Sequence, residues 1–570
     1  MKRWLKQGKL WTVAASGLMV GGLLCGVMAS TGVPAASGDA SPVLTMESSP
    51  ASSITNNFNP YQPTSASVLL GATSLIYEPL LQFDVAQPTK APYDFLASGY
   101  SWGKGGKSIT FTIRSGVKFS NGTAMTPADV AFTYTMLEKN PSVNTYGVPI
   151  SGVSSTSSTV TVDFSASEYT NLQNVAGELY IVPESQWSAY TTPGSQVISD
   201  TQAIGTGPYV VSSWTPQGFT LKVNPNYWGG PFAAAGTPPA VKSIYFPALT
   251  SNSVVLSQLV SGSLTWAGNF ITGLQKAFVG ANPATNHVWF APVNTVTFYP
   301  NLTRWPTNQL VVRQAISLAV NRTELSKSGE GGGEPPATNA SGLTLPNFQS
   351  LISASVKKDT LPAKSDIAGA KRLLEKAGYT RNSKGYFEKN GKVVALTIGE
   401  PAAYTDYAAD AALAATELRK AGIDATFVGQ SVAAWGADIT DGHYQLDIHW
   451  GTTSISAYQL YNYWLNSTLY TASPKAVTGD FERLVNKSID KDLATLAGAT
   501  TLAAQAKALA PIESFVATQL PVIPILYGAS FDEYSTAHFT GWPSASHPYE
   551  SGSPNTPTNE VIVLHLSPTS

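Results

Sequence analysis

The sequence predicts an α/β protein with two lobes. Two strand–helix–strand units lie far apart in the chain, at 241–266 and 393–428, and such alternation favours mixed or parallel sheets covered by helices. The chain has 570 residues, of which 43% are hydrophobic. Because a single hydrophobic core stops growing at roughly 250 to 300 residues, we expect each unit to belong to a core of its own.

The first predicted elements follow a lead-in at 41–65 that is rich in Ser, Thr, Asn and Pro. Ile109, Phe111 and Ile113 alternate with polar residues, which predicts a half-buried strand. The sequence TPAD at 126–129 then predicts the start of a helix, with threonine as the N-cap, proline at the first position and aspartate bonding back to a free N–H.

The stretch GTGPYVVSSWTPQGFTLKV at 205–223 has the glycines of a phosphate-binding loop. Such a loop must run into a helix whose free N–H groups face the anion. After Gly207, however, apolar residues alternate with polar ones on both sides of a turn, which predicts a β-hairpin. We expect Gly205 and Gly207 to allow a sharp turn of the chain there, with a structural role.

The two strand–helix–strand units follow the hairpin. In the first, a strand with Ile244 and Phe246 precedes a helix at 254–260 that ends at Gly262. In the second, the helix at 406–421 joins strands at 393–398 and 423–428, and Gly422 stops the helix. Further helices are predicted at 310–322 and 367–377.

The N-terminal residues predict an export signal. Four basic residues precede an apolar run at 10–29, and small residues follow at 33–36, so we expect a signal peptide at 1–35 with cleavage near Ala35 and an extracytoplasmic location, at the cell surface or in a periplasm. Leucine before Cys25 does not favour lipid attachment. The run is long enough to stay as an uncleaved membrane anchor, which remains the alternative.

Composition and missing motifs exclude several classes of function. The chain has 34 basic and 36 acidic residues, so no basic excess favours nucleic acid. It contains no P-loop, HExxH or GxSxG motif, and its histidines are scattered, so we expect neither a cofactor nor a metal, and no enzyme. A secreted glycoside hydrolase using Asp438 and Asp441, placed on a turn, is the alternative from another class.

Charged residues make up 12% of the chain, about half the usual fraction. Uncharged polar residues must therefore keep the surface hydrated, and this composition would suit an exterior exposed to acid or to changing salt. Aromatic residues are plentiful, and one group falls near predicted loop mouths in the second half of the chain. It consists of Trp435, Trp450, Tyr458, Tyr461 and Trp464. Core packing and stacking on a ligand are both open interpretations.

Six stretches in order resemble the extracytoplasmic solute-binding proteins of family 5, which serve ABC importers of dipeptides and oligopeptides. They are SITFTIRSGVKFSNGTAMTPADVAFTYTML at 108–137, GTGPY with NPNYWGG at 205–230, GSL at 262–264, VVRQAISLAVNR at 311–322, KRLLEKAGY at 371–379 and PVIPILYG at 521–528. The resemblance covers nearly the whole chain after the signal.

That resemblance implies a periplasmic-binding-protein-like fold that closes over a small-molecule ligand, acts as a monomer and docks on permease subunits in the membrane. Hinges are expected near 291–297 and 517–526. The implied domains are lobe 1 at 42–78, 205–293 and 525–570, an inserted subdomain of lobe 1 at 79–204, and lobe 2 at 294–524.

One departure from the family affects the expected ligand. Peptide-binding members have a Trp-x-Ala-Asp segment whose aspartate holds the peptide's α-ammonium, and Thr453 stands at that position here. Either Asp447 or Glu78 replaces the carboxylate, or the ligand has no cationic end, as a neutral oligosaccharide has none. Peptide is the family default and oligosaccharide the alternative. The expected ligand-binding residues are Trp266, Trp435, Trp450, Thr453, Tyr458, Tyr461, Trp464 and Asp447.

Overall fold

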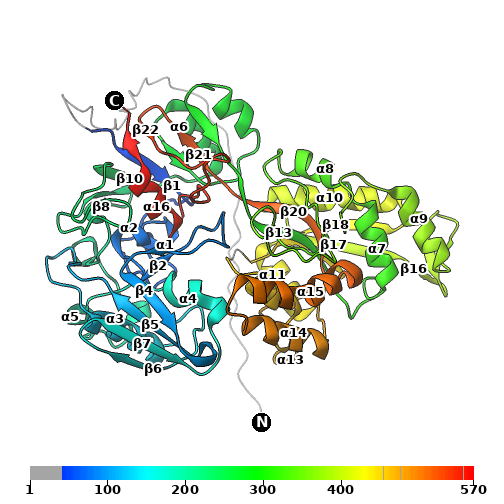
Figure 1. Ribbon diagram of the computed structural model, residues 1–570. Helices are drawn as coiled ribbons and strands as arrows, with labels where there is room; N and C mark the ends of the chain where they lie inside the picture. The colour runs from blue at the N-terminus through cyan, green and yellow to red at the C-terminus, as the bar shows by residue number, and fades with distance from the viewer. Residues whose placement is uncertain (1–40, 453–454, 475–476, 556, 570) are drawn as a thin grey trace, which may run out of the picture. The chain divides into compact units, whose positions relative to one another are not determined.

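The computed structural model describes residues 41–452, 455–474, 477–555 and 557–569 (Figure 1). The predicted signal peptide and Thr453 lie outside these residues. The described chain contains two large mixed sheets and a smaller antiparallel one, and the expected two-lobed α/β fold is confirmed. None of the helices in this part of the chain is long and apolar enough to cross a membrane.

Lobe 1 is built on a seven-stranded sheet. Its strands in spatial order are β12 (Asn286–Val288), β21 (Glu533–Ser535), β11 (Trp266–Ala267), β1 (Leu44–Glu47), β10 (Ser243–Pro247), β9 (Gly218–Val223) and β8 (Tyr209–Thr215). The predicted first strand–helix–strand unit is present, with α6 (Asn252–Ser261) between β10 and β11. The two strands are not neighbours, because β1 lies between them and pairs in parallel with both.

The predicted hairpin is confirmed, because β8 and β9 pair antiparallel across the turn. The chain bends at 206–208, at the expected place, but neither Gly205 nor Gly207 has a positive φ. Gly207 instead donates its N–H to the carbonyl of Ile76 (2.9 Å), and a Cβ on Gly207 would lie 2.6 Å from the Ile76 carbonyl carbon. Both glycines therefore allow two chain segments to approach closely.

A four-stranded antiparallel sheet forms the extra subdomain of lobe 1. Its order is β4 (Ala97–Trp102), β5 (Ser108–Ile113), β7 (Thr159–Phe164) and β6 (Ile150–Ser155), and α3 (Pro127–Lys139) packs on β6 and β7. As predicted, Thr126 precedes the first turn of α3 and donates its N–H to Asp129 (2.9 Å). The core of this subdomain is continuous with that of the seven-stranded sheet.

Lobe 2 is built on a five-stranded sheet. The order is β18 (Asp424–Gln430), β17 (Ala395–Pro401), β19 (Leu446–Trp450), β13 (Ala291–Pro300) and β20 (Ile523–Ser530). The predicted second unit is confirmed, because β17, α10 (Thr405–Lys420) and β18 follow one another and the two strands pair in parallel. Further helices include α7 (Leu310–Ala319), α9 (Ile367–Lys376), α12 (Ala457–Leu465), α14 (Lys487–Ala497) and α15 (Leu502–Gln519).

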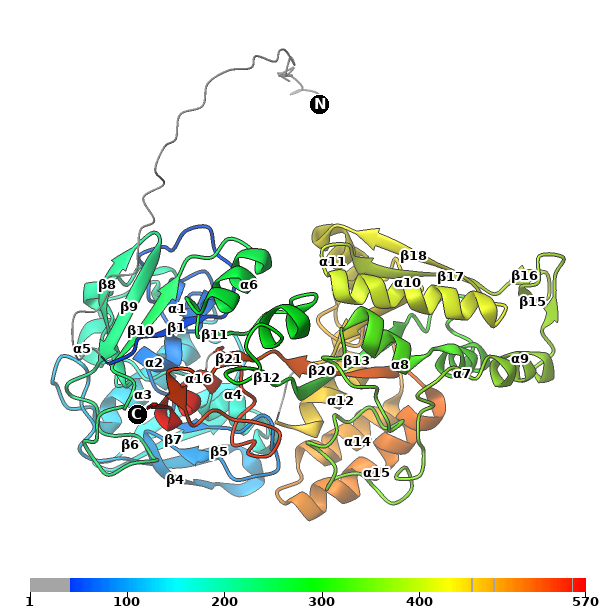
Figure 2. The same ribbon diagram turned by 90° about the horizontal axis from the view of Figure 1, so that it is seen from above.

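The chain crosses between the two sheets twice. The first crossing, at 289–290, joins β12 to β13, and the second, at 531–532, joins β20 to β21. Figure 2 shows β13 and β20 side by side between the lobes. The second crossing lies beyond the expected hinge at 517–526, whose residues end α15 and begin β20. The predicted domain boundaries at 293/294 and 524/525 fall inside β13 and β20 and stay a prediction.

Candidate functional site

Both crossings lie at the carboxyl edges of parallel strands. In lobe 1, Ala267 at the end of β11 pairs with Glu533, the first residue after the second crossing. In lobe 2, Trp450 at the end of β19 pairs with Val296, in the middle of β13, whose first half runs back to the first crossing. Ligands of open α/β sheets bind outside the carboxyl ends of the strands. The region between the lobes is therefore where the topology favours a ligand site.

A cavity of about 810 Å³ lies in this region and is lined by both lobes. Its wall is rich in amide side chains, which both donate and accept hydrogen bonds. These amides include Asn171, Gln173, Asn294, Gln459, Asn462 and Asn555. Among the described residues that line the cavity, none is Lys, Arg or His. The wall therefore offers many neutral polar contacts and no positive charge from these residues.

Short helices of the inserted subdomain meet lobe 2 directly at this cavity. Asn171 ends η2 (Tyr169–Asn171) and accepts a hydrogen bond from the Gln459 side chain on α12 (2.7 Å). Gln173, on α4 (Leu172–Ala176), accepts from the backbone N–H of Ile455 (3.3 Å). These bonds join residues almost 300 positions apart in sequence, so the cavity is closed on this side by polar contacts between the lobes.

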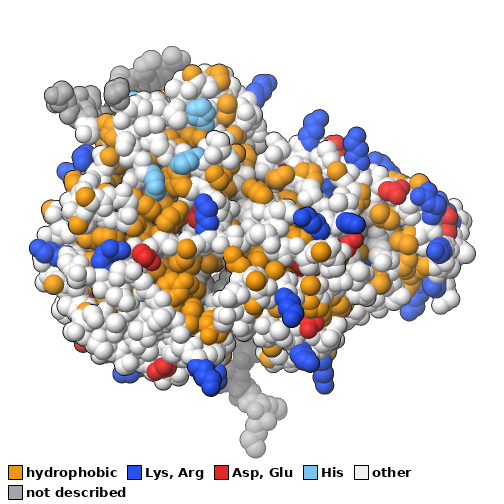
Figure 3. Space-filling view, in the orientation of Figure 1, with side chains coloured by type: hydrophobic (Ala, Val, Ile, Leu, Met, Phe, Trp, Pro, Cys, Tyr) orange, Lys and Arg blue, Asp and Glu red, His pale blue; other side chains and the backbone are white. Residues whose placement is uncertain are grey.

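Two carboxyl groups, Glu168 and Glu178, lie in the cavity wall. Glu178 accepts from Gln173 (3.1 Å) and from the Tyr146 hydroxyl (3.2 Å), and burial raises its pKa to about 7. Glu168 accepts from Asn171 (2.6 Å), and burial raises its pKa as well. The wall is thus neutral to weakly acidic. Charged side chains are also scattered sparsely over the face of the molecule in Figure 3.

One of the predicted aromatic residues lines the cavity, and a second lies two positions in sequence from a lining residue. Tyr458, on α12, is part of the lining. Trp450 is 36% exposed and ends β19, two residues before the lining residue Thr452. Its ring packs on His449 at 3.6 Å between centroids, with Tyr404 and Tyr407 within 6 Å. Trp450 therefore presents a flat, partly exposed surface that its aromatic neighbours hold in place.

Three other predicted residues are packed inside the protein. Trp464 donates its indole N–H to the Tyr299 hydroxyl (3.1 Å), and Tyr461 donates to the carbonyl of Ser341 (2.9 Å). Trp266 is 0% exposed and donates to a carboxyl group at the second crossing. None of the three is part of the cavity lining. Their role in ligand binding stays a prediction.

The two carboxylates considered as replacements for the family's aspartate are also buried. Asp447 is 1% exposed and accepts the indole N–H of the predicted residue Trp435 (2.9 Å), and burial raises its pKa. Glu78 accepts the indole N–H of Trp228 (2.8 Å), and burial raises its pKa to about 7. Neither carboxyl lies in the described cavity wall. An ammonium group in the cavity would meet Glu168 or Glu178 instead.

The residues of the alternative hydrolase do not stand on a turn. Asp438 and Asp441 lie on α11 (Val432–Asp441), and Asp438 accepts a hydrogen bond from Gln430 (2.6 Å). Both are absent from the described lining of the cavity. Within the described residues, no group of three or more His, Cys, Asp or Glu is placed to hold a metal ion.

The amide-rich part of the site does not follow from the sequence. Asn171, Gln173, Gln459 and Asn462 come from two separate helical segments and form no motif. Apart from the Asn and Gln content of the chain, no signal in the sequence singles out these residues, because only their meeting across the lobes makes them a site.

Comparison with known proteins identifies the family. The family described as "Bacterial extracellular solute-binding proteins, family 5 Middle" matches residues 91–471. The nickel-binding periplasmic protein of Escherichia coli is 26% identical over 396 residues, which are 67% of this chain and 71% of that protein. The oligopeptide-binding protein OppA of Bacillus subtilis is 23% identical over 305 residues, which are 50% and 54% of the two chains.

Solved structures show the same fold. A periplasmic oligopeptide-binding protein of an ABC transporter from Thermotoga maritima matches with a TM-score of 0.81 and 23% identity, over 92% of this chain and 99% of that one. A structure of that protein with bound mannohexaose matches with a TM-score of 0.72 and 24% identity, over 92% and 98%. The chain belongs to the bacterial extracellular solute-binding proteins of family 5, the binding components of ABC importers.

Proposed function

We propose that this chain captures an uncharged, hydroxyl-rich ligand, an oligosaccharide, and delivers it to the permease of an ABC importer. The observation that carries this proposal is the amide-lined cavity between the lobes, with no basic side chain among its described lining residues. A cavity of about 810 Å³ is in the size range of small-molecule sites.

The lining favours sugar hydroxyls for two reasons. An amide side chain offers both a donor and an acceptor, and a hydroxyl needs both when it leaves water. Tyr458 in the wall and the partly exposed Trp450 beside it offer flat rings to the apolar face of a sugar. The Thermotoga maritima structure with mannohexaose supports the same ligand class for this fold.

An oligopeptide is the second candidate ligand. Glu168 and Glu178 in the wall would accept hydrogen bonds from a peptide's α-ammonium group. Several relatives are also named as peptide-binding proteins. A free peptide carboxylate, however, would find no basic partner among the described lining residues, and burying an unpaired charge is costly. This favours the oligosaccharide.

Capture works by a shift of population between an open and a closed form. A ligand that contacts both lobes binds the closed form more tightly, and the permease recognises that form. No bond is made or broken in the process. We infer that the protein acts as a monomer, and that residues 1–35 are a cleaved signal peptide, with an uncleaved anchor as the alternative. N-terminal sequencing of the exported protein distinguishes the two.

A panel of ligands tests the proposed class. Thermal unfolding is measured with manno-, cello-, xylo- and malto-oligosaccharides, and with tripeptides whose carboxyl end is either free or amidated. A ligand at 100 times its Kd stabilises the protein by about 2.7 kcal/mol. We expect at least one oligosaccharide to raise the unfolding temperature. The proposal fails if tripeptides with a free carboxylate stabilise the protein and no oligosaccharide does.

The variant Tyr458→Ala locates the binding event. It removes a ring from the cavity wall, so it should weaken binding of the stabilising ligand. A matched control is Tyr386→Ala, on the turn before β15 (Phe387–Lys389) and outside the lining, which should leave the affinity unchanged. Equal affinities for all three proteins would place the ligand elsewhere.

A further inference from the structure

Three carboxyl groups gather where the chain crosses between the lobes. Glu47 ends β1, Asp532 forms part of the second crossing, and Glu533 begins β21. Their side chains are 2%, 0% and 0% exposed, respectively. The second crossing is hydrogen-bonded to the first, because the backbone N–H of Trp289 in the first crossing donates to the backbone carbonyl of Asp532 (2.9 Å).

The hydrogen bonds of these carboxyls come only from neutral donors. Asn269 donates its backbone N–H to Glu533 (3.2 Å) and its side-chain amide to Glu47. Trp266 donates its indole N–H to Asp532 (2.9 Å). The second oxygen of each carboxyl is buried and has no hydrogen-bond partner among the described residues.

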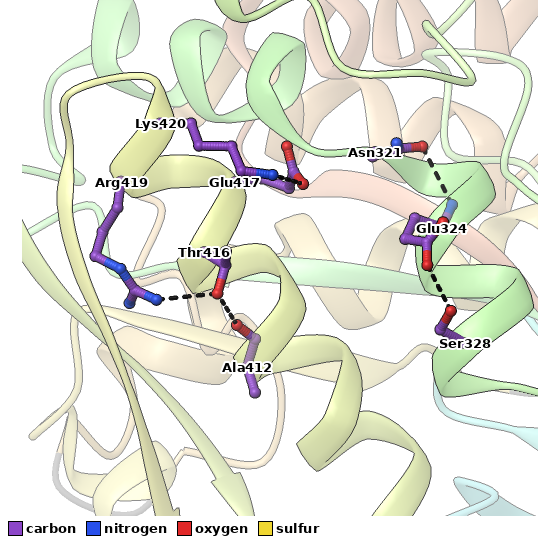
Figure 4. Close-up of polar contacts among 8 residues, drawn as sticks. All are labelled: Asn321, Glu324, Ser328, Ala412, Thr416, Glu417, Arg419 and Lys420. Atoms are coloured by element: carbon purple, nitrogen blue, oxygen red, sulfur yellow. Dashed lines mark hydrogen bonds and ion pairs between the residues drawn. The ribbon is translucent and has the colours of Figure 1, made fainter.

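Among the residues that the structure describes, no basic side chain forms an ion pair with the three carboxyls. The described residues form two ion pairs, Glu375 with Arg381 and Glu417 with Lys420, and both are on the surface of lobe 2. Figure 4 shows the second pair at the end of α10. No group of the described acidic residues is placed to hold a metal ion.

The described titratable groups nearest the cluster are two tyrosines, a further carboxyl and a histidine. Besides the neighbouring carboxyl of Glu533, Asp532 faces Tyr534 and Tyr549, and Glu550 lies beside Tyr549. His287, on β12, packs against the Tyr534 ring (5.5 Å between centroids) and lies near the Thr536 hydroxyl.

A buried carboxylate without a counter-charge is costly, so such a group takes up a proton instead. Burial raises the pKa of Glu47 to about 7. It raises the pKa of Asp532 and of Glu533 well above the usual range, and the neighbouring carboxyl of the cluster raises each further. A protonated carboxyl can also donate a hydrogen bond, and the buried oxygens of this cluster that lack a partner need a donor.

We propose that the joint between the lobes is held together by protonated Glu47, Asp532 and Glu533, and that their ionisation loosens it as the medium becomes neutral. The protein is then built to capture its ligand in an acidic medium. This pH response is a property of the two crossings and does not depend on the identity of the ligand. It can therefore be tested separately from the proposed function.

The direction of the pH effect follows from proton binding. In an opened joint the carboxyls titrate near their ordinary values of about 4, whereas in the closed joint their pKa values are raised. The closed joint therefore holds extra protons between these values. The closed joint is therefore most stable below about pH 4. As the pH rises above this value, the equilibrium constant for opening increases about ten-fold per pH unit for each carboxyl. The increase ends when the pH passes the raised pKa of that carboxyl.

Hydrogen exchange at the crossings tests the proposal. Protection of the amides at 286–293 and 528–535 is measured from pH 4 to pH 8 and corrected for intrinsic exchange. In the unmodified protein we expect protection to fall more than a hundred-fold over this range. In the double variant Asp532→Asn, Glu533→Gln, whose amides cannot ionise, most of that fall should disappear.

Two further variants make the result decisive. Glu47→Gln alone should make the loss of protection between pH 4 and pH 8 smaller by a factor on the order of a hundred, because the raised pKa of Glu47 lies about two to three pH units above its ordinary value. This variant provides the test if the double variant does not fold at pH 4. Glu513→Gln alters a buried carboxyl on α15 that accepts from Ser353 (2.9 Å), and it should leave the pH response of the crossings unchanged. The proposal is overturned if protection does not depend on pH, or if the double variant and Glu47→Gln lose protection as the unmodified protein does.

Discussion

Residues of one type play different roles in lobe 2 according to their burial. Trp450 is 36% exposed and rests on His449, whereas Trp464 is 0% exposed and bonds to Tyr299 inside the hydrophobic core around α12. The two tryptophans lie fourteen positions apart and were equivalent candidates by sequence. Their substitution should separate ligand binding from stability.

Trp450→Ala should weaken the affinity for the best-stabilising oligosaccharide by roughly ten-fold, about 1.4 kcal/mol, because a braced stacking surface is lost. The free energy of unfolding without ligand should change by less than about 1 kcal/mol, since part of the ring is already in water. Calorimetric titration and urea unfolding measure the two quantities. An unchanged Kd would remove Trp450 from the site.

Trp464→Ala should instead destabilise the protein by about 3 to 5 kcal/mol, the usual cost of removing a large buried aromatic side chain. Urea unfolding without ligand measures this loss. If stability were unchanged while ligand binding disappeared, Trp464 would be a ligand contact and not a core residue.

At the scale of elements, the close approach of two chain segments decides whether a glycine can be replaced by alanine. Gly207, just before the hairpin, lies against the backbone of Ile76, the last residue of α2 (Thr73–Ile76), where a Cβ does not fit. A Cβ added to Gly436, inside α11, would meet no other described residue within 4 Å apart from the nearby backbone of its own helix, and Gly436 has no positive φ. The two positions therefore predict opposite effects of the same substitution.

Gly207→Ala should destabilise the protein by about 1 to 3 kcal/mol, because the added methyl group forces β8 and α2 apart. Gly436→Ala should stabilise it by about 1 kcal/mol, since alanine is the better helix former. Thermal and urea unfolding of both variants check the signs. A neutral Gly207→Ala variant would mean that the contact between the two segments relaxes without cost.

Elements with local signals were predicted well, and those defined by distant partners were not. Periodicity and Gly422 placed α10 and its flanking strands to within a few residues. The insertion of β1 between β10 and β11, and the position of the second crossing after β20, have no local signal. Both depend on which strands pair, which is a property of the folded chain.

For the whole molecule, the scarcity of charge extends to the interior. Buried acidic side chains occur in both lobes without a basic partner, as in the facing pairs Glu78 with Glu560 and Glu330 with Asp410. The buried Arg313 and Arg322 donate to backbone carbonyls and a serine hydroxyl, not to carboxylates. The acid-tolerant exterior suggested by composition is thus matched by an interior that favours protonated carboxyls.

Global stability should accordingly be highest in acid. The pKa of Glu78 is raised to about 7 and that of Glu334 to about 8 by burial, whereas both titrate near 4.3 when unfolded. The folded state therefore binds more protons between these values, and the unfolding temperature should fall as pH rises from about 4 to 8. Calorimetry across this range measures it, and a maximum near neutral pH would contradict the prediction.

Glu560→Gln isolates one contribution to this trend. The variant keeps the shape of the side chain that accepts from Gln82 and faces Glu78, but it cannot ionise. Its unfolding temperature should fall less steeply with pH than that of the unmodified protein. The exchange protection of the two crossings should keep its normal pH response, because Glu78 and Glu560 interact with each other and not with Glu47, Asp532 or Glu533.

The sequence by itself determined the lobes' secondary structure and the family, because hydrophobic periodicity, capping residues and the six family stretches are local patterns. Only the tertiary structure decided which side chains line the cavity and which carboxyls lack a counter-charge. Asn171 and Gln459 meet across 288 positions of sequence, and the burial of Asp532 depends on neighbours from distant strands. Contact and desolvation are set by neighbours in space, which no local pattern encodes.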